Sequence, residues 1–70
     1  MKVVYDTRTD ILTMQFKEVV AIVESDELKP GFIIDYDAGG EIVSLEILDA
    51  SRRVADARSV EFSFAEPSLP

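Results

Sequence analysis

Apolar and polar residues alternate with a period of two along most of this 70-residue sequence. A period of two places successive side chains on opposite faces of an extended strand, so it predicts strands rather than long amphipathic helices. Turn-forming residues separate the alternating stretches, which favours antiparallel hairpins. The alternating stretches are residues 2–6, 12–16, 32–37, 43–47 and 60–65.

The first predicted hairpin is closed by the polar residues 7–10. Closing the chain at this loop places Tyr5 opposite Leu12 and Val3 opposite Met14. All four side chains then lie on one face, so the position of the loop and the apolar alternation predict the same hairpin.

The second predicted hairpin turns at Gly39-Gly40, a pair suited to the positive φ angles of a type I′ turn. That turn pairs Tyr36 with Val43, Ile34 with Leu45 and Phe32 with Ile47. A turn at Ala38-Gly39 keeps the same apolar residues on one face but changes the register, so both positions remain open.

Two more strands are predicted outside these hairpins. Residues 19–23 are apolar at every position, which is typical of a strand covered on both faces. Residues 24–31 then read as a loop that ends at Pro30-Gly31. Residues 60–65 alternate again and predict a strand near the end of the sequence.

Between the strands, residues 49–57 have helix-forming composition, with Asp49 or Ser51 available as N-cap. So short a helix is marginal alone and should dock on the sheet. The predicted fold is therefore α+β: a small antiparallel sheet of hairpins with a short C-terminal helix packed on it. We expect one domain over residues 1–66 and a loose tail over residues 67–70.

A chain of this size buries only about 60% of the surface that its unfolded form exposes. Small domains compensate with disulfides, a structural metal or oligomerisation. The sequence contains no cysteine and no histidine, which excludes disulfides and ordinary zinc sites. Oligomerisation remains, alongside a site for a hard cation made of carboxylates.

The apolar content of 47% exceeds what one face of the sheet and a short helix can cover. An uncovered apolar face usually marks an association surface, and a symmetric dimer is its commonest use. The residues expected at this interface are Val19, Ala21, Val23, Ile33, Ile42 and Leu48.

Fourteen acidic and seven basic side chains give a formal net charge of −7. Nucleic-acid binding needs clustered basic residues, and the single cluster here is Arg52, Arg53 and Arg58, so we expect none. No apolar run approaches the ~20 residues of a membrane span, and the first six residues do not resemble a signal peptide. We expect a cytoplasmic protein with no membrane partner. The acidity favours solubility, and attraction to a basic protein partner is the alternative.

The sequence lacks the residues that most catalytic mechanisms need. A nucleophilic triad usually needs histidine as base, and the glycine-rich phosphate-binding motifs are absent, so we expect no enzyme and no cofactor. The hairpin carrying Asp35, Asp37 and Glu46 approaches the spacing of a calcium loop. Gly39 occupies one ligand position, and the flanks alternate like strands, so a plain hairpin turn is favoured. Calcium binding at these three residues is the alternative.

Several short motifs together resemble a family of small bacterial and archaeal proteins, domain of unknown function 2283. The similarity spans about residues 3–53, with Gly39, Thr13 and Ser44 departing from the usual residues. It implies a compact α+β domain and no established activity, and some members look like partners of small toxin-like proteins. We therefore expect a non-enzymatic, self-associating interaction module, with an antitoxin-like role by analogy. The motifs are Tyr5-Asp6, Asp10 with Leu12, Pro30-Gly31, Asp35-Tyr36-Asp37 with Gly40, and Glu46-Ile47-Leu48-Asp49-Ala50-Ser51.

Overall fold

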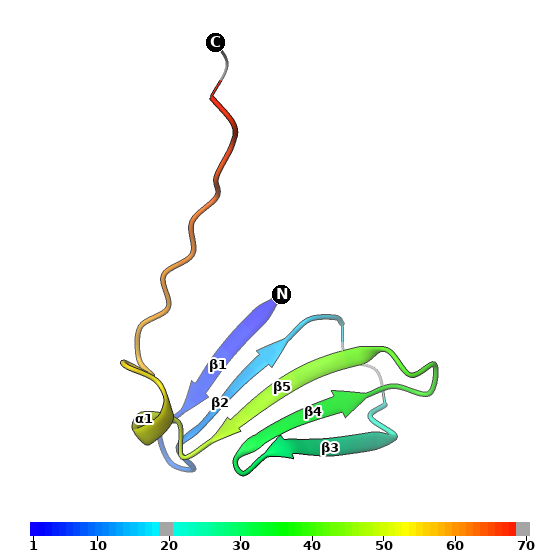
Figure 1. Ribbon diagram of the computed structural model, residues 1–70. Helices are drawn as coiled ribbons and strands as arrows, with labels where there is room; N and C mark the ends of the chain where they lie inside the picture. The colour runs from blue at the N-terminus through cyan, green and yellow to red at the C-terminus, as the bar shows by residue number, and fades with distance from the viewer. Residues whose placement is uncertain (19–20, 69–70) are drawn as a thin grey trace.

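The computed structural model of the chain describes residues 1–18 and 21–68. These residues form one antiparallel five-stranded sheet, in the order β1-β2-β5-β4-β3, and one short helix (Figure 1). The predicted α+β fold is confirmed. The elements are β1 (Lys2–Asp6), β2 (Ile11–Gln15), β3 (Glu24–Lys29), β4 (Phe32–Tyr36), β5 (Ile42–Leu48) and α1 (Ala50–Arg53).

The hairpin of β1 and β2 has the predicted register. Tyr5 pairs with Leu12 and Val3 pairs with Met14. β2 then pairs with the central strand β5, where Leu12 lies opposite Ile47. This pairing joins the first hairpin to the second.

The hairpin of β4 and β5 keeps two predicted pairs, Phe32 with Ile47 and Ile34 with Leu45. The predicted pair of Tyr36 with Val43 is wrong, because a register shift places Tyr36 opposite Ile42. A β-bulge inserts one extra residue into a strand, so the alternation of faces changes there.

The turn between these strands begins one residue before the Gly39-Gly40 position. The Gly40 N–H donates to the Asp37 carbonyl at 3.0 Å, which makes Ala38 and Gly39 the central residues. Gly40 alone of the two glycines has a positive φ, 78°. The type I′ turn is therefore wrong and the alternative at Ala38-Gly39 is confirmed, since this geometry matches an ordinary turn followed by a left-handed glycine.

The segment before β4 differs from the prediction of a strand followed by a loop. Residues 24–29, predicted to be part of a loop, form the edge strand β3, whose side chains are all exposed. Of the predicted strand at residues 19–23, Val19 and Val20 lie outside the described residues, and Ala21–Val23 is exposed and outside any strand. A polar segment can form an edge strand because pairing with β4 needs only its backbone, and charged side chains suit an edge.

The core lies on one face of the sheet, which we call the core face. Its buried side chains are Leu12, Ile47, Ala50 and Ala57. α1 covers this face at the end of β5, where Ala50 is fully buried. The partly buried residues that pack around the cluster are Val3, Tyr5, Phe32, Leu45 and Val54.

α1 spans four residues rather than the predicted nine. Val54 has extended backbone angles and ends the helix. Asp49 is the N-cap residue, one of the two predicted, but it has φ 52° and its side chain makes no capping hydrogen bond. The other candidate, Ser51, lies within α1 and is not the N-cap. A residue from the first hairpin takes over this task.

Asp10 caps α1 from the loop between β1 and β2. Its carbonyl accepts the Ala50 N–H at 2.9 Å, and its carboxylate accepts the Ser51 N–H at 2.9 Å and the Ser51 hydroxyl at 2.7 Å. The Tyr5 hydroxyl donates to the same carboxylate at 2.6 Å. Its hydrogen bonds from Tyr5 and then Ser51 lower the pKa of Asp10, and the bond to Asp10 raises the pKa of Tyr5.

The chain after Ala57 leaves the sheet as an extended segment, which we call the distal segment (residues 58–68; Figure 1). The strand predicted at residues 60–65 is not formed, because the alternation has no neighbouring strand to pair with. The radius of gyration is 14.5 Å, against about 11 Å for a compact chain of this length. In the described part of the chain, no helix has the length and apolar character to cross a membrane.

Candidate functional site

Asp37 stabilises the turn between β4 and β5. One of its carboxylate oxygens accepts the N–H groups of Gly39 at 2.9 Å and Glu41 at 3.0 Å. The other forms an ion pair with the Lys17 ammonium at 3.1 Å. These contacts, chiefly the hydrogen bond from Glu41 and then that from Lys17, lower the pKa of Asp37. Both oxygens are therefore occupied by contacts within the chain.

Asp35 is a buried carboxylate in the middle of the sheet, only 3% exposed. The Ser25 hydroxyl donates to one oxygen at 2.6 Å and the Ser44 hydroxyl to the other at 2.7 Å. Burial alone would raise the pKa of Asp35, but the hydrogen bonds from the two serines and Glu46 outweigh it and lower that pKa. The serines thus supply the donors that a buried carboxylate requires.

Glu46 is the acidic partner of Asp35. Asp35 pairs with Ser44, and Glu46 follows two residues later on the same face, so the two acids are diagonal neighbours on adjacent strands. A hydrogen bond to Asp35, then burial and charge repulsion, raise the pKa of Glu46. Because the pKa of Glu46 is raised and that of Asp35 is lowered, Glu46 takes up a proton before Asp35 as the pH falls.

The acidic pair adjoins an open hollow of about 240 Å³. The hollow lies on the face opposite the core face and is lined by Thr13, Gln15, Ile22, Asp35, Val43, Ser44 and Glu46. Sequence reasoning grouped Asp35 with Asp37, whereas the structure pairs Asp35 with Glu46 and holds Asp37 at the turn. In residues 1–18 and 21–68, no three acidic residues gather as a set that could hold a metal ion. The signal that was missed is the diagonal spacing across the hairpin.

The residues predicted for the apolar interface are divided among several surfaces. Ile33 and Leu48 are partly buried on the face opposite the core face. Ile42 was predicted to join them, but its pairing with Tyr36 places it on the core face, where it is 42% exposed. The remaining predicted residues, Ala21 and Val23, are exposed in the connection before β3, and Val19 lies outside the described residues.

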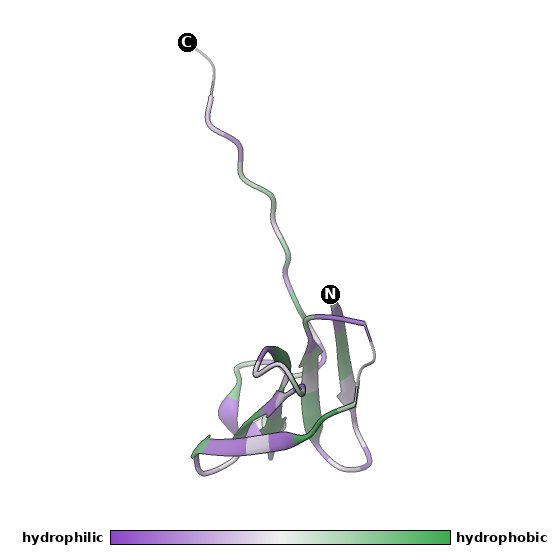
Figure 2. Cartoon of the chain, turned by 90° about the vertical axis from the view of Figure 1, so that its right-hand side faces the viewer, coloured by the Kyte–Doolittle hydropathy of each residue, from purple (hydrophilic) through white to green (hydrophobic). Residues whose placement is uncertain are grey.

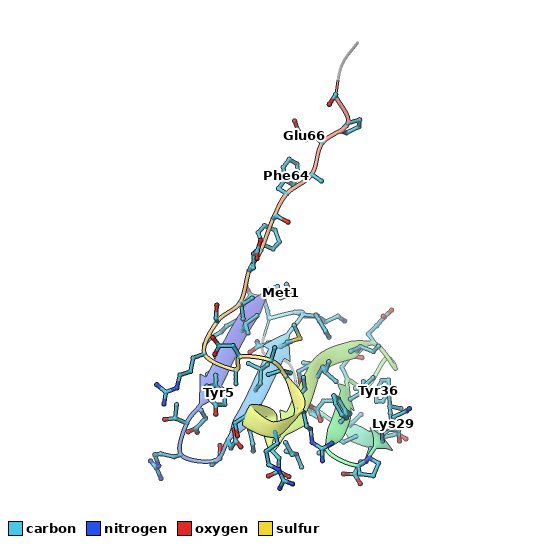
Figure 3. All side chains as sticks on the ribbon, turned by 60° about the vertical axis from the view of Figure 1, so that its left-hand side comes forward. Met1, Tyr5, Lys29, Tyr36, Phe64 and Glu66 are labelled. Carbon is cyan, nitrogen blue, oxygen red and sulfur yellow. The ribbon has the colours of Figure 1, made fainter. Side chains whose placement is uncertain are left out.

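A larger apolar exposure lies on the distal segment. Val60 is 58% exposed, Phe62 79% and Phe64 76%. Figure 3 shows Phe64 far from the sheet, and Figure 2 shows hydrophobic stretches along the extended chain. Sequence reasoning recognised the alternation but assigned these residues to the sheet of the same chain, so it missed their exposure.

A family model described as protein of unknown function (DUF2283) matches residues 2–51. The chain belongs to the DUF2283 family. The DUF2283 match includes all five strands, the Asp35–Glu46 pair and the Asp10 cap, and it ends within α1 before the distal segment. Comparison with curated proteins and with solved structures gives no significant match.

Proposed function

We propose that this DUF2283 domain is a non-enzymatic protein-interaction module that associates with itself. The observation that carries this proposal is the amount of apolar surface left in water. Ten large apolar side chains of the described residues are each at least 42% exposed, more than the buried core contains. They are Met1, Val4, Phe16, Ile22, Val23, Leu28, Ile42, Val60, Phe62 and Phe64.

Exposed apolar residues scattered singly are normal on a soluble protein, but contiguous patches mark association surfaces. Val60, Phe62 and Phe64 form one patch, because every second residue of an extended segment points to the same side. Covering them with another copy of the chain would remove this surface from water at the usual gain of about 25 cal/mol per Å².

The direct test is the molar mass of the full chain, measured by light scattering after size-exclusion chromatography over a range of concentrations. We expect a dimer that dissociates on dilution. A monomer at every concentration, up to the highest that remains soluble, would reject self-association.

The acidic edge of the sheet favours a basic protein as a second kind of partner. β3 carries Glu24, Asp26 and Glu27, all exposed, and Figure 2 shows this strand as mainly hydrophilic. An antitoxin-like role would use such an edge to bind a small basic protein. The test is co-purification from native lysate: the bound protein should be basic, dissociate as salt rises, and be lost on Asp26→Ser/Glu27→Ser substitution.

A further inference from the structure

We propose that residues 60–65 form an additional β-strand on β1 of a second copy of the chain, with the two copies exchanging these strands reciprocally. This inference rests on the proposed self-association and specifies its interface. It commits to one occupant for the free edge of β1, the distal segment of the other copy.

The distal segment has the composition of a strand but lacks a neighbour. Val60, Phe62 and Phe64 alternate with Glu61, Ser63 and Ala65, so an added strand would place its three large apolar side chains on one face. The backbone is already extended, and residues 60–68 make no backbone hydrogen bond within the described residues. Pairing with a sheet edge would satisfy those groups.

The sheet has two edges, and their charges distinguish them. β3 carries three carboxylates in six residues, and its register shifts between Glu27 and Lys29, both of which protect an edge from further pairing. The distal segment itself carries Glu61 and Glu66, so pairing with β3 would bring like charges together. β1 carries one lysine and one aspartate and is the edge that the charges favour.

The core face beside β1 contains an open hollow that suits the added side chains. It has a volume of about 390 Å³ and is lined by Val3, Tyr5, Thr7, Leu12, Ala57, Arg58 and Val60. A strand added to β1 with its apolar residues on the core face would place Phe62 or Phe64 next to Val3 and Tyr5. Aromatic cross-strand pairs of this kind stabilise antiparallel sheets.

A second copy, rather than the same chain, is the source of the strand. The segment leaves the sheet after the buried residue Ala57 and diverges from it, so that Phe64 and Glu66 lie far from every strand of their own copy (Figures 1 and 3). Val60 already borders the hollow near its own β1. A two-fold axis close to Val60 would therefore place the distal segment of each copy beside β1 of the other copy. Such an exchange is closed and self-complementary.

The area available is sufficient for a specific dimer. Each phenylalanine buries roughly 150–250 Å² when covered, so the four phenylalanines of the two copies would bury roughly 600–1,000 Å². The recipient surfaces of β1 and the hollow lose a comparable area. The total exceeds the ~1,000 Å² that separates specific interfaces from incidental contacts.

The first experiment compares the dimerisation of the full chain with that of Phe62→Ser/Phe64→Ser, by sedimentation equilibrium. We expect the dissociation constant to rise by at least about 100-fold, because two buried aromatic anchors are lost from each copy. The control variant, Glu61→Ser/Ala65→Ser, changes the other face of the same segment and should remain dimeric. Circular dichroism should show a folded sheet in both variants, because these residues lie outside the folded core, and Phe62→Ser/Phe64→Ser should lose only the strand signal of the exchanged segments.

The second experiment locates the strand with cysteines, which the natural sequence lacks. Val4 lies on the face opposite the core face, where Ser63 of an added strand would also lie. Val4→Cys/Ser63→Cys should therefore oxidise to a covalent dimer. Glu27→Cys/Ser63→Cys is the matched control, because Glu27 lies in the same row of residues at the β3 edge, and it should remain uncrosslinked.

The outcomes separate the two proposals. A full chain that is monomeric at every concentration overturns both of them. A dimer that survives Phe62→Ser/Phe64→Ser overturns the strand exchange and leaves self-association standing. A disulfide within one copy of Val4→Cys/Ser63→Cys shows that the segment covers its own β1, which also overturns the exchange.

Discussion

Replacing each of the three glycines by alanine in turn should separate the cost of a left-handed backbone from the cost of a steric conflict. Gly40 has φ 78°, and apart from its two chain neighbours no heavy atom lies within 4 Å of the position that a Cβ would take. Gly39 lacks a positive φ, and its nearest neighbour is Asp37 Oδ1 at an ordinary 3.4 Å. Gly31 has φ 86°, and a Cβ there would lie 2.5 Å from Cζ of Arg53.

These differences set the expected losses in the free energy of unfolding. Gly40→Ala should cost about 1–2 kcal/mol, the usual cost of left-handed backbone for an L-residue. Gly39→Ala should be neutral or stabilise the fold by up to about 1 kcal/mol, because alanine restricts the unfolded chain. Gly31→Ala should cost roughly 2–4 kcal/mol, because it also displaces a side chain that makes two contacts.

The displaced side chain is that of Arg53. Its Nε donates to the Leu48 carbonyl at 2.8 Å, and its guanidinium carbon lies 5.4 Å from the centre of the Phe32 ring. Introducing Gly31→Ala into Arg53→Ala should therefore cost no more than Gly40→Ala does in the natural chain. This double-mutant comparison isolates the conflict from the backbone strain.

The assay is urea unfolding followed by circular dichroism, at one fixed protein concentration because dimerisation would make stability concentration-dependent. Each kcal/mol corresponds to a shift of about 4–8 °C in Tm for a domain of this size. The reasoning is refuted if Gly31→Ala is no more destabilising than Gly40→Ala, or if its cost is unchanged in Arg53→Ala.

Further predictions concern the core, the acidic pair, the tyrosine and the turn. Leu12→Ala should destabilise the fold by about 2–5 kcal/mol in urea unfolding, because it empties the centre of the core face; a loss below 1 kcal/mol would contradict that core. The raised pKa of Glu46 means that its contribution to stability is complete below the unfolded pKa and is lost as pH rises through the folded pKa. Glu46→Gln should therefore gain up to about 1 kcal/mol at pH 7 and lose this advantage toward pH 4.5, and a constant difference would contradict the pair. The raised pKa of Tyr5 likewise predicts that stability falls as the tyrosine ionises above pH 10, a loss that Tyr5→Phe should not show in alkaline titration. Millimolar calcium should leave the NMR signal of the Gly40 amide in place, because the Asp37 carboxylate is already engaged; a saturable shift would restore the calcium alternative.

The parts of the fold that were predictable are those in which the local sequence decides the geometry. The register of β1 and β2 follows from residues 7–10 and from the alternation on both sides. The bulge beside Ile42 was not predictable, because the alternation continues through it without a signal. β3 was missed because its strand conformation comes from the free edge of β4, not from its own polar side chains.

The cap of α1 and the acidic pair depend on tertiary contacts. Asp10 and Ser51 are 41 residues apart, so no local pattern connects them. Asp35 and Glu46 become neighbours only after the bulge and the register are fixed. In contrast, several residues that carry the family resemblance, including Tyr5, Asp10 and Ser51, turn out to hold the helix against the first hairpin.

The strand order has a consequence for how the chain folds. Each hairpin contains contacts close in sequence, but they meet only where β2 pairs with β5, across at least 28 intervening residues between Gln15 and Ser44. Closing a loop of that length costs entropy before its contacts form, so this step should limit the folding rate. During synthesis, the first hairpin must wait with one side of β2 unsatisfied until β5 has left the ribosome.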